Sequence, residues 1–69
     1  MIELRFHEEL YDGFAIDEAV KTFEGHATFE LVREPPGYVV RVTGNREELV
    51  ADELANYALG KTIEKRGAA

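Results

Sequence analysis

The sequence contains no cysteine and no serine. Without cysteine there is no disulfide framework, no thiolate zinc site and no redox motif, so nothing marks the chain as secreted. A serine or cysteine hydrolase is excluded, and the 4 threonines lack any recognisable activating motif. We therefore expect no nucleophilic catalysis from this chain.

Long apolar runs are also missing. No stretch approaches the roughly 18 apolar residues that are needed to span a bilayer. No positively charged and then apolar leader begins the chain. We expect a cytoplasmic protein that is neither exported nor embedded in a membrane.

Positive charge is scarce, because 8 Lys and Arg stand against 14 Asp and Glu, and the net charge is −6. Nucleic-acid binding draws its general affinity from clustered Lys and Arg, whereas the basic residues here are scattered. We therefore expect no nucleic-acid partner. The acidic balance keeps a small domain soluble, which is the favoured interpretation, and would also steer it towards a basic partner. Charge alone names no partner.

The chain has 69 residues and is long enough for one domain. We place this domain at residues 1–66 and expect a mobile tail at residues 67–69. A core of this size supplies about 3–5 kcal/mol of net stability unless something else contributes. A partner surface is one natural source of further stability.

Three segments alternate apolar and polar residues, which is the period-2 pattern of a strand with one buried face. They lie at residues 2–7, 27–31 and 38–42. Between the last two lies the turn sequence Glu34-Pro35-Pro36-Gly37, in which proline cannot donate to a ladder and Gly37 accepts a positive φ. The turn predicts an antiparallel hairpin with both apolar sets on one face, and on the opposite, solvent-facing side it brings Glu30 near Arg41.

Two segments have the spacing of amphipathic helices. The first covers residues 16–23, with Asp17 and Glu18 in its first turn, and Gly25 is expected to close it in the left-handed conformation. The second covers residues 45–65, where Asn45 and Glu48 form a capping box. One aromatic and two aliphatic residues flank its apolar stripe, Tyr57 on one side and Leu59 and Ile63 on the other. The stripe itself comprises Val50, Ala51, Leu54, Ala55 and Ala58.

The element order is therefore β-α-β-β-α, an α+β fold. We expect a three-stranded, mainly antiparallel sheet in the order 1-3-2, because the third strand then pairs antiparallel with both others. The two helices cover one face of the sheet. Either outer strand would present free N–H and C=O groups to a peptide or to a second copy of the chain.

Two histidines, His7 and His26, lie near Glu8, Glu9 and Glu24 in the sequence. There is no HExxH motif, no histidine pair at helical spacing and no calcium loop, so we assign no metal ligands and no cofactor. The glycines are isolated and do not form a phosphate-binding loop. A stand-alone enzyme would require Glu8, Glu24 and the histidines to converge in space.

Four aromatic residues could form an exposed binding patch: Tyr11, Phe14, Tyr38 and Tyr57. Tyr38 alternates with Val40 and Val42 and is expected to face the core. Tyr57 flanks the apolar stripe of the last helix, where a phenol can bury its ring and keep its hydroxyl in water. Tyr57 is the better candidate for partner contact, but packing at the core boundary is favoured over it, because a flanking aromatic residue is ordinary in small cores.

The stretch FAIDEAVKTFEGHATFELVREPPGYVVRVTG, followed by ELANYALGKTIEK, resembles the HxsD family. Members of this family are small accessory proteins of the His-Xaa-Ser radical-SAM peptide-maturation system. The last helix is similar to the LxNxxL pattern of the family at Leu54, Asn56 and Leu59, and Gly60 then departs from it. The resemblance implies a non-catalytic partner of a radical-SAM enzyme or of its substrate peptide, with the iron–sulfur cluster held by the enzyme.

We therefore expect a small cytoplasmic, non-catalytic module that binds a protein or peptide through a sheet edge or through Asn56 and Tyr57. An alternative is a self-associating domain, in which an outer strand or the last helix pairs with a second copy to form a homodimer. The two hypotheses differ in whether the mass of the protein depends on its concentration.

Overall fold

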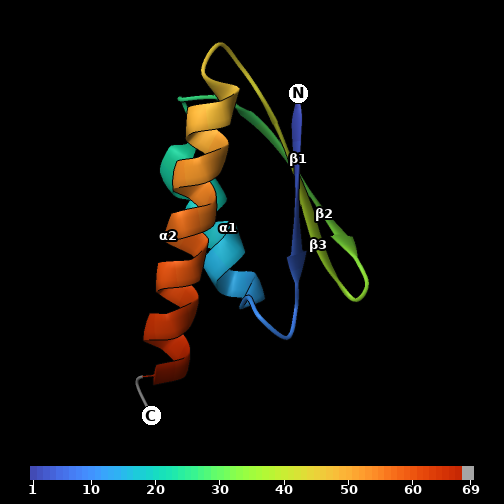
Figure 1. Cartoon of the computed structure of the whole chain (residues 1–69), viewed down its shortest axis with the longest axis vertical. Helices are drawn as coiled ribbons and strands as arrows, with labels where there is room; N and C mark the ends of the chain where they lie inside the picture. Colours follow the sequence, from blue (N-terminus) through green and yellow to red (C-terminus); the bar gives the residue numbers. More distant parts are fainter. Residues whose placement is uncertain (68–69) are drawn as a thin grey trace.

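The computed structural model describes residues 1–67, which form three strands and two helices in the predicted β-α-β-β-α order (Figure 1). The elements are β1 (Ile2–His7), α1 (Gly13–Phe23), β2 (Thr28–Glu34), β3 (Gly37–Thr43) and α2 (Glu47–Gly67). Gly67, which belongs to the predicted tail, is the last residue of α2, and residues 68 and 69 lie outside the described part.

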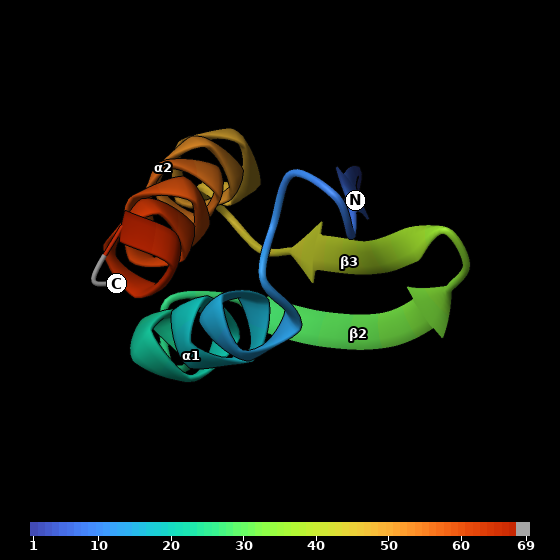
Figure 2. The same cartoon turned by 90° about the horizontal axis from the view of Figure 1, so that it is seen from below.

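The three strands form one antiparallel sheet in the order β1-β3-β2, which confirms the predicted arrangement. The two-residue loop Pro35-Pro36 joins the paired residues Glu34 and Gly37, so the apolar sets of β2 and β3 share one face. Seen along the molecule, the sheet and the two helices form separate layers, with α1 beside β2 (Figure 2). The fold therefore has one face covered by helices and one open face.

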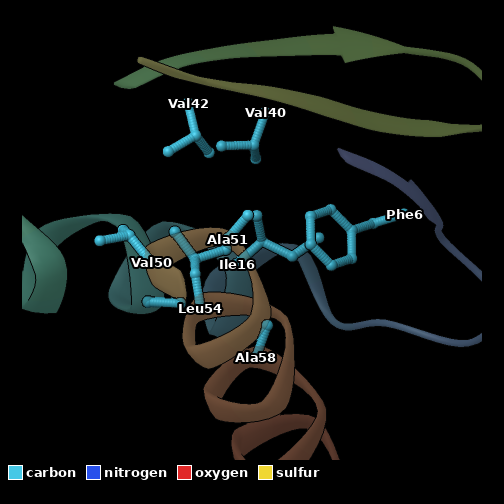
Figure 3. Packing of buried hydrophobic residues seen from close by; sticks show 9 residues of the cluster. Phe6, Ile16, Val40, Val42, Val50, Ala51, Leu54 and Ala58 are labelled. Atoms are coloured by element: carbon cyan, nitrogen blue, oxygen red, sulfur yellow. The ribbon is translucent and has the colours of Figure 1, made fainter. Parts of the chain in front are cut away.

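The core lies between the sheet and the helices (Figure 3). Val40 and Val42 point from β3 towards Ile16 of α1 and Leu54 of α2 (Figure 3), and all four are completely buried. Alanines at the buried positions of the two helices allow α1 and α2 to approach closely. The cluster consists of Phe6, Ile16, Ala19, Val40, Val42, Val50, Ala51, Leu54 and Ala58.

Helix α1 begins three residues earlier than the periodicity predicted, because Asp12 caps it. The Asp12 carboxylate accepts a hydrogen bond from the Ala15 N–H at 3.0 Å, and this satisfies one free donor of the first turn. The prediction that Asp17 and Glu18 occupy the first turn is therefore wrong. At the other end Gly25 has φ +95°, which confirms the predicted left-handed residue after the helix.

Helix α2 begins at Glu47, two residues after the predicted start. Glu47, rather than Glu48, reaches back to accept the Gly44 N–H at 3.3 Å. The Met1 ammonium also donates to Glu47, at 2.7 Å, and this hydrogen bond lowers the pKa of the Glu47 carboxyl. The helix continues through Gly60 to Gly67.

The buried stripe of α2 differs from the prediction in its C-terminal half. Thr62 is buried, whereas Leu59 and Ile63 are exposed by 40% and 62%. The four-residue step from Ala58 to Thr62 keeps Thr62 on the buried stripe, next to Asp12 at the start of α1, and the predicted aliphatic flank lies in solvent. A threonine can occupy this buried position because its hydroxyl has hydrogen-bond partners, as described below.

The open face of the sheet is less polar than predicted, because Val39 lies there and is only 1% exposed. Its register neighbours are Arg5 on β1 and Val32 on β2, and their side chains flank it. Arg5 is held by Glu34 at 3.2 Å and by Glu3 at 2.9 Å, and the hydrogen bond with Glu34 is the main cause that raises the Arg5 pKa. The stem of this arginine thus lies over an apolar centre.

Arg41 continues the same set of ion pairs across the open face. It contacts Glu30 at 2.6 Å, as the predicted register requires, and Glu3 at 3.2 Å. The hydrogen bond with Glu30 is the main cause that raises the Arg41 pKa. Exposed pairs of this kind contribute little stability each, so they order the face more than they hold the fold together.

Gly37 is needed for a reason other than the predicted positive φ, since Gly25 is the one glycine with positive φ among the described residues. A Cβ on Gly37 would collide with the carbonyl oxygen of Phe6 on the neighbouring strand. Strand β1 therefore lies against a position where only glycine fits.

Two glycine-to-alanine substitutions test this packing. We expect Gly37→Ala to lower the free energy of unfolding by about 1–3 kcal/mol, because β1 must move away from the new methyl group. Gly60→Ala is the matched control, since a Cβ there meets nothing within 4 Å. It should raise the free energy of unfolding by about 0.5–1 kcal/mol through better helix propensity. Urea unfolding measures both, and equal stabilities of the two variants would contradict the account.

Candidate functional site

The start of α1 is tied to α2 through Thr62. Its hydroxyl accepts the Asp12 N–H at 3.0 Å and donates to the Ala58 carbonyl at 2.8 Å. Arg66 holds the same connection, because its guanidinium donates to the carbonyls of Glu9 at 2.6 Å and Glu8 at 3.1 Å. The C-terminal half of α2 therefore fixes the position at which α1 begins.

The first turn of α1 rests against Tyr38 of β3. A Cβ on Gly13 would collide with the Tyr38 hydroxyl, so the phenol lies directly against the Gly13 backbone. The guanidinium of Arg33 lies over the Tyr38 ring, 5.5 Å from its centroid. Tyr38 points to the helix-covered face as predicted, although it is only half-buried because it lies at the end of that face.

A groove opens between this first turn and the sheet. It is an open hollow of ≈ 460 Å³ lined by Asp12, Gly13, Phe14, Asp17, Leu31 and Tyr38, and we call it the α1–β2 groove. Phe14 stands at its rim and is 79% exposed. The only charged groups in the lining are two carboxylates, of which Asp17 is paired with Lys21 at 2.9 Å. The groove therefore combines apolar surface with negative charge.

Strand β2 forms the margin of the sheet next to this groove. It pairs with β3 on one side, and no strand of residues 1–67 pairs with its other side. Figure 2 shows β2 as the outer strand on the side of α1. Leu31 belongs both to this strand and to the groove lining, so an unpaired edge and an apolar hollow lie side by side.

The predicted site residues Asn56 and Tyr57 face different directions on α2. The Tyr57 ring packs edge-on against Phe23 of α1, with centroids 5.8 Å apart, and the Lys61 ammonium lies 5.7 Å from its centroid. Asn56 is exposed. Consecutive helical residues are separated by about 100°, so one small ligand would not readily contact both side chains. Tyr57 therefore lies at the boundary of the core, which is the alternative to partner contact for this residue.

Asn56 lies on the outer face of α2 with three exposed aliphatic residues. Leu49, Asn56 and Ile63 recur at intervals of seven, and Leu59 lies between the last two. We call these four residues the outer face of α2. This spacing keeps them on one side of the helix.

The four aromatic residues considered for an exposed patch do not form one. Tyr11 packs edge-on against Phe6, with centroids 4.8 Å apart, so Phe14 is the exposed member of the four candidate aromatics. The sequence carried a signal for it: Phe14 falls outside the stripe of Ile16, Ala19, Val20 and Phe23. Periodicity alone does not predict that Phe14 and Leu31 line the same groove, because that depends on how α1 is placed over the sheet.

The two histidines do not come together. His7 pairs with Gly37 at one end of the sheet, and its Nδ1 accepts the Glu9 N–H at 3.1 Å. His26 follows α1 next to β2, whose first residue pairs with Thr43 at the opposite end of β3. Glu8 is engaged with Arg33 at 2.8 Å. Within residues 1–67, no group of three or more potential ligands from His, Cys, Asp and Glu could hold a metal ion.

Comparisons with known proteins found no family model, no curated protein and no solved structure that matches this chain. Among the described residues, neither helix has the length and apolar character needed to cross a membrane.

The junction at Thr62 gives a direct test of how the groove is held. Thr62→Val keeps the shape of the side chain but leaves the Asp12 N–H without its partner. We expect the free energy of unfolding to fall by about 1–3 kcal/mol, as measured by urea unfolding. Thr62→Ser keeps the hydroxyl and should retain more stability than Thr62→Val. A valine variant as stable as the original protein would show that this hydrogen bond does not hold α1.

Proposed function

We propose that this chain is a non-catalytic accessory module that binds a protein or peptide segment at the outer edge of β2 and in the α1–β2 groove. One observation carries the proposal: an unpaired strand edge lies beside an apolar hollow whose rim residue, Phe14, is 79% exposed. An extended segment gains affinity from main-chain hydrogen bonds at such an edge and specificity from adjoining pockets.

The resemblance to the HxsD family extends this proposal to a biological setting. The chain would act in the cytoplasm beside a radical-SAM peptide-modifying enzyme, and it would bind either the enzyme or its substrate peptide. The chemistry and the iron–sulfur cluster would belong to the enzyme, since this chain has no cysteine to hold a cluster.

An amide-shift NMR titration tests the proposal. The labelled protein is first diluted alone and then titrated with the precursor peptides and maturation enzymes encoded by neighbouring genes. We expect shifts in β2 and at Phe14 that appear only with one of these products.

Two exposed hydrophobic residues provide matched variants for this titration. Phe14→Ala should weaken the binding, because it removes the rim of the groove without opening the core. Ile63→Ala truncates a similarly exposed side chain on α2 and should leave the affinity unchanged. Binding that responds to Ile63 and not to Phe14 would move the site to α2, and no response to any product would contradict the proposed function.

The outer face of α2 favours a second candidate function, a homodimer with a structural or regulatory role. Leu49, Leu59 and Ile63 are exposed, and Asn56 lies among them. In paired helices such an asparagine sets register and oligomeric state while reducing stability. The acidic residues on the same side, Glu48, Asp52 and Glu53, oppose close pairing of two identical helices.

The mass of the protein over a wide range of concentration distinguishes the two functions. The accessory-module proposal predicts a monomer at every concentration in sedimentation velocity. A homodimer through α2 would give a mass that rises with concentration, and Ile63→Lys would return it to the monomer. Ile63→Ser is the control for lost apolar area without added charge.

A further inference from the structure

The hydrogen-bonding pattern of β3 determines which backbone N–H and C=O groups of β2 point to the free edge. The Glu8 N–H donates to the Pro36 carbonyl at 3.0 Å, one step beyond the pair formed by His7 and Gly37. Bonded and non-bonded pairs alternate in an antiparallel ladder. Tyr38 and Val40 therefore direct their backbone N–H and C=O groups to β1, whereas Val39 and Arg41 direct theirs to β2.

The same alternation then applies to β2. Val39 pairs with Val32, and Arg41 pairs with Glu30, so Glu30 and Val32 are bonded to β3. The intervening residues Phe29, Leu31 and Arg33 leave their N–H and C=O groups on the outer edge. Of these three, Leu31 lines the α1–β2 groove.

For a strand added antiparallel to this edge, the pairing determines which of its side chains lies next to the groove. Antiparallel addition continues the pattern of the existing sheet. The added residue opposite Leu31 exchanges both main-chain hydrogen bonds with it, and its side chain lies on the same face as Leu31. That side chain enters the groove beside Phe14, where the surface is apolar. A large apolar residue fits this position.

The charges around the edge set the chemistry of the neighbouring positions. The charged groups of the groove lining are the carboxylates of Asp12 and Asp17. On the open face, the next added residue lies opposite Glu30, which is paired with Arg41 at 2.6 Å but keeps its side chain 64% exposed. Asp17 is paired with Lys21 at 2.9 Å, and the cation of the edge itself, Arg33, is paired with Glu8 at 2.8 Å. The exposed carboxylates and the net charge of −6 therefore favour positive charge on the added strand. A second copy of this chain would instead bring the same carboxylates of the groove towards each other.

We infer that β2 accepts as a fourth strand an extended, positively charged segment that places a large apolar side chain opposite Leu31 and a basic side chain opposite Glu30. This inference rests on the proposed function and specifies its ligand. It goes beyond the proposed function because it predicts which N–H groups of the bound peptide donate to β2. The inference can therefore fail while the proposed function holds.

Synthetic seven-residue peptides test it with the unaltered protein. The first probe is acetylated and amidated Lys-Val-Lys-Leu-Lys-Val-Lys. Two derivatives carry a single N-methyl group, one on the central leucine and one on the lysine before it. The leucine N–H points to β2 in the inferred register, whereas the lysine N–H points away, so the two derivatives match in composition and differ only in the hydrogen bond removed.

We expect methylation of the leucine to weaken binding by about tenfold or more, since a hydrogen bond is lost and the methyl group clashes with the edge. Methylation of the lysine should leave the affinity within about threefold, since hydrogen bonds to solvent are exchanged there. The variant Glu-Val-Glu-Leu-Glu-Val-Glu should not bind. Upon binding of the first probe, the amides of Phe29, Leu31 and Arg33 should gain protection from hydrogen exchange.

A protein variant adds a second, independent readout. Arg33→Pro removes an N–H from the free edge and leaves the bonds to β3 in place, as proline is tolerated on that side of an edge strand. It should abolish binding of the first probe, and Arg33→Ala should retain it. An amide spectrum with dispersed β3 resonances confirms that both variants are folded.

Several results would overturn the inference. Equal effects of the two N-methyl groups, or binding that leaves β2 unprotected, would exclude strand addition at this edge. If a natural partner binds but the lysine probe does not, the proposed function stands and the inferred ligand chemistry fails. If neither binds, both fail. Shifts of the β2 amides on dilution of the protein alone would assign the edge to a second copy.

Discussion

The position of β3 between β1 and β2 is the constraint on which the rest of the structure depends. Both sides of β3 are hydrogen-bonded, and Val40 and Val42 anchor the two helices to its covered face. With β3 in the centre, β1 and β2 become the edges, and α1 lies beside β2 (Figure 2). The groove and the free edge that we propose as a binding site are consequences of this one arrangement.

Most of the fold follows from local patterns in the sequence. Alternation identified the three strands, the turn at Glu34–Gly37 joined two of them, and the crossing helix made the order β1-β3-β2 the simplest closure. The errors lie at positions governed by single contacts. Asp12 starts α1 early through a cap, and Gly37 is required by the approach of Phe6 from another strand, which no local pattern expresses.

The candidate site was less accessible to sequence reasoning than the fold. A free edge could be expected from the strand order, but the groove beside it also involves a contact between distant residues, in which the Thr62 hydroxyl ties Asp12 to α2. A threonine in an apolar stripe gives no sign of that role. Asn56 and Tyr57 are adjacent in the sequence, yet the helix turns them apart, and their part in binding stays a prediction.

Amide hydrogen exchange along β2 in the free protein tests the central claim most directly. If backbone groups alternate between β3 and the free edge, the amides of Glu30 and Val32 exchange slowly and those of Phe29, Leu31 and Arg33 exchange fast. Uniform protection along β2 would contradict this account, because it would mean that the outer edge is already occupied.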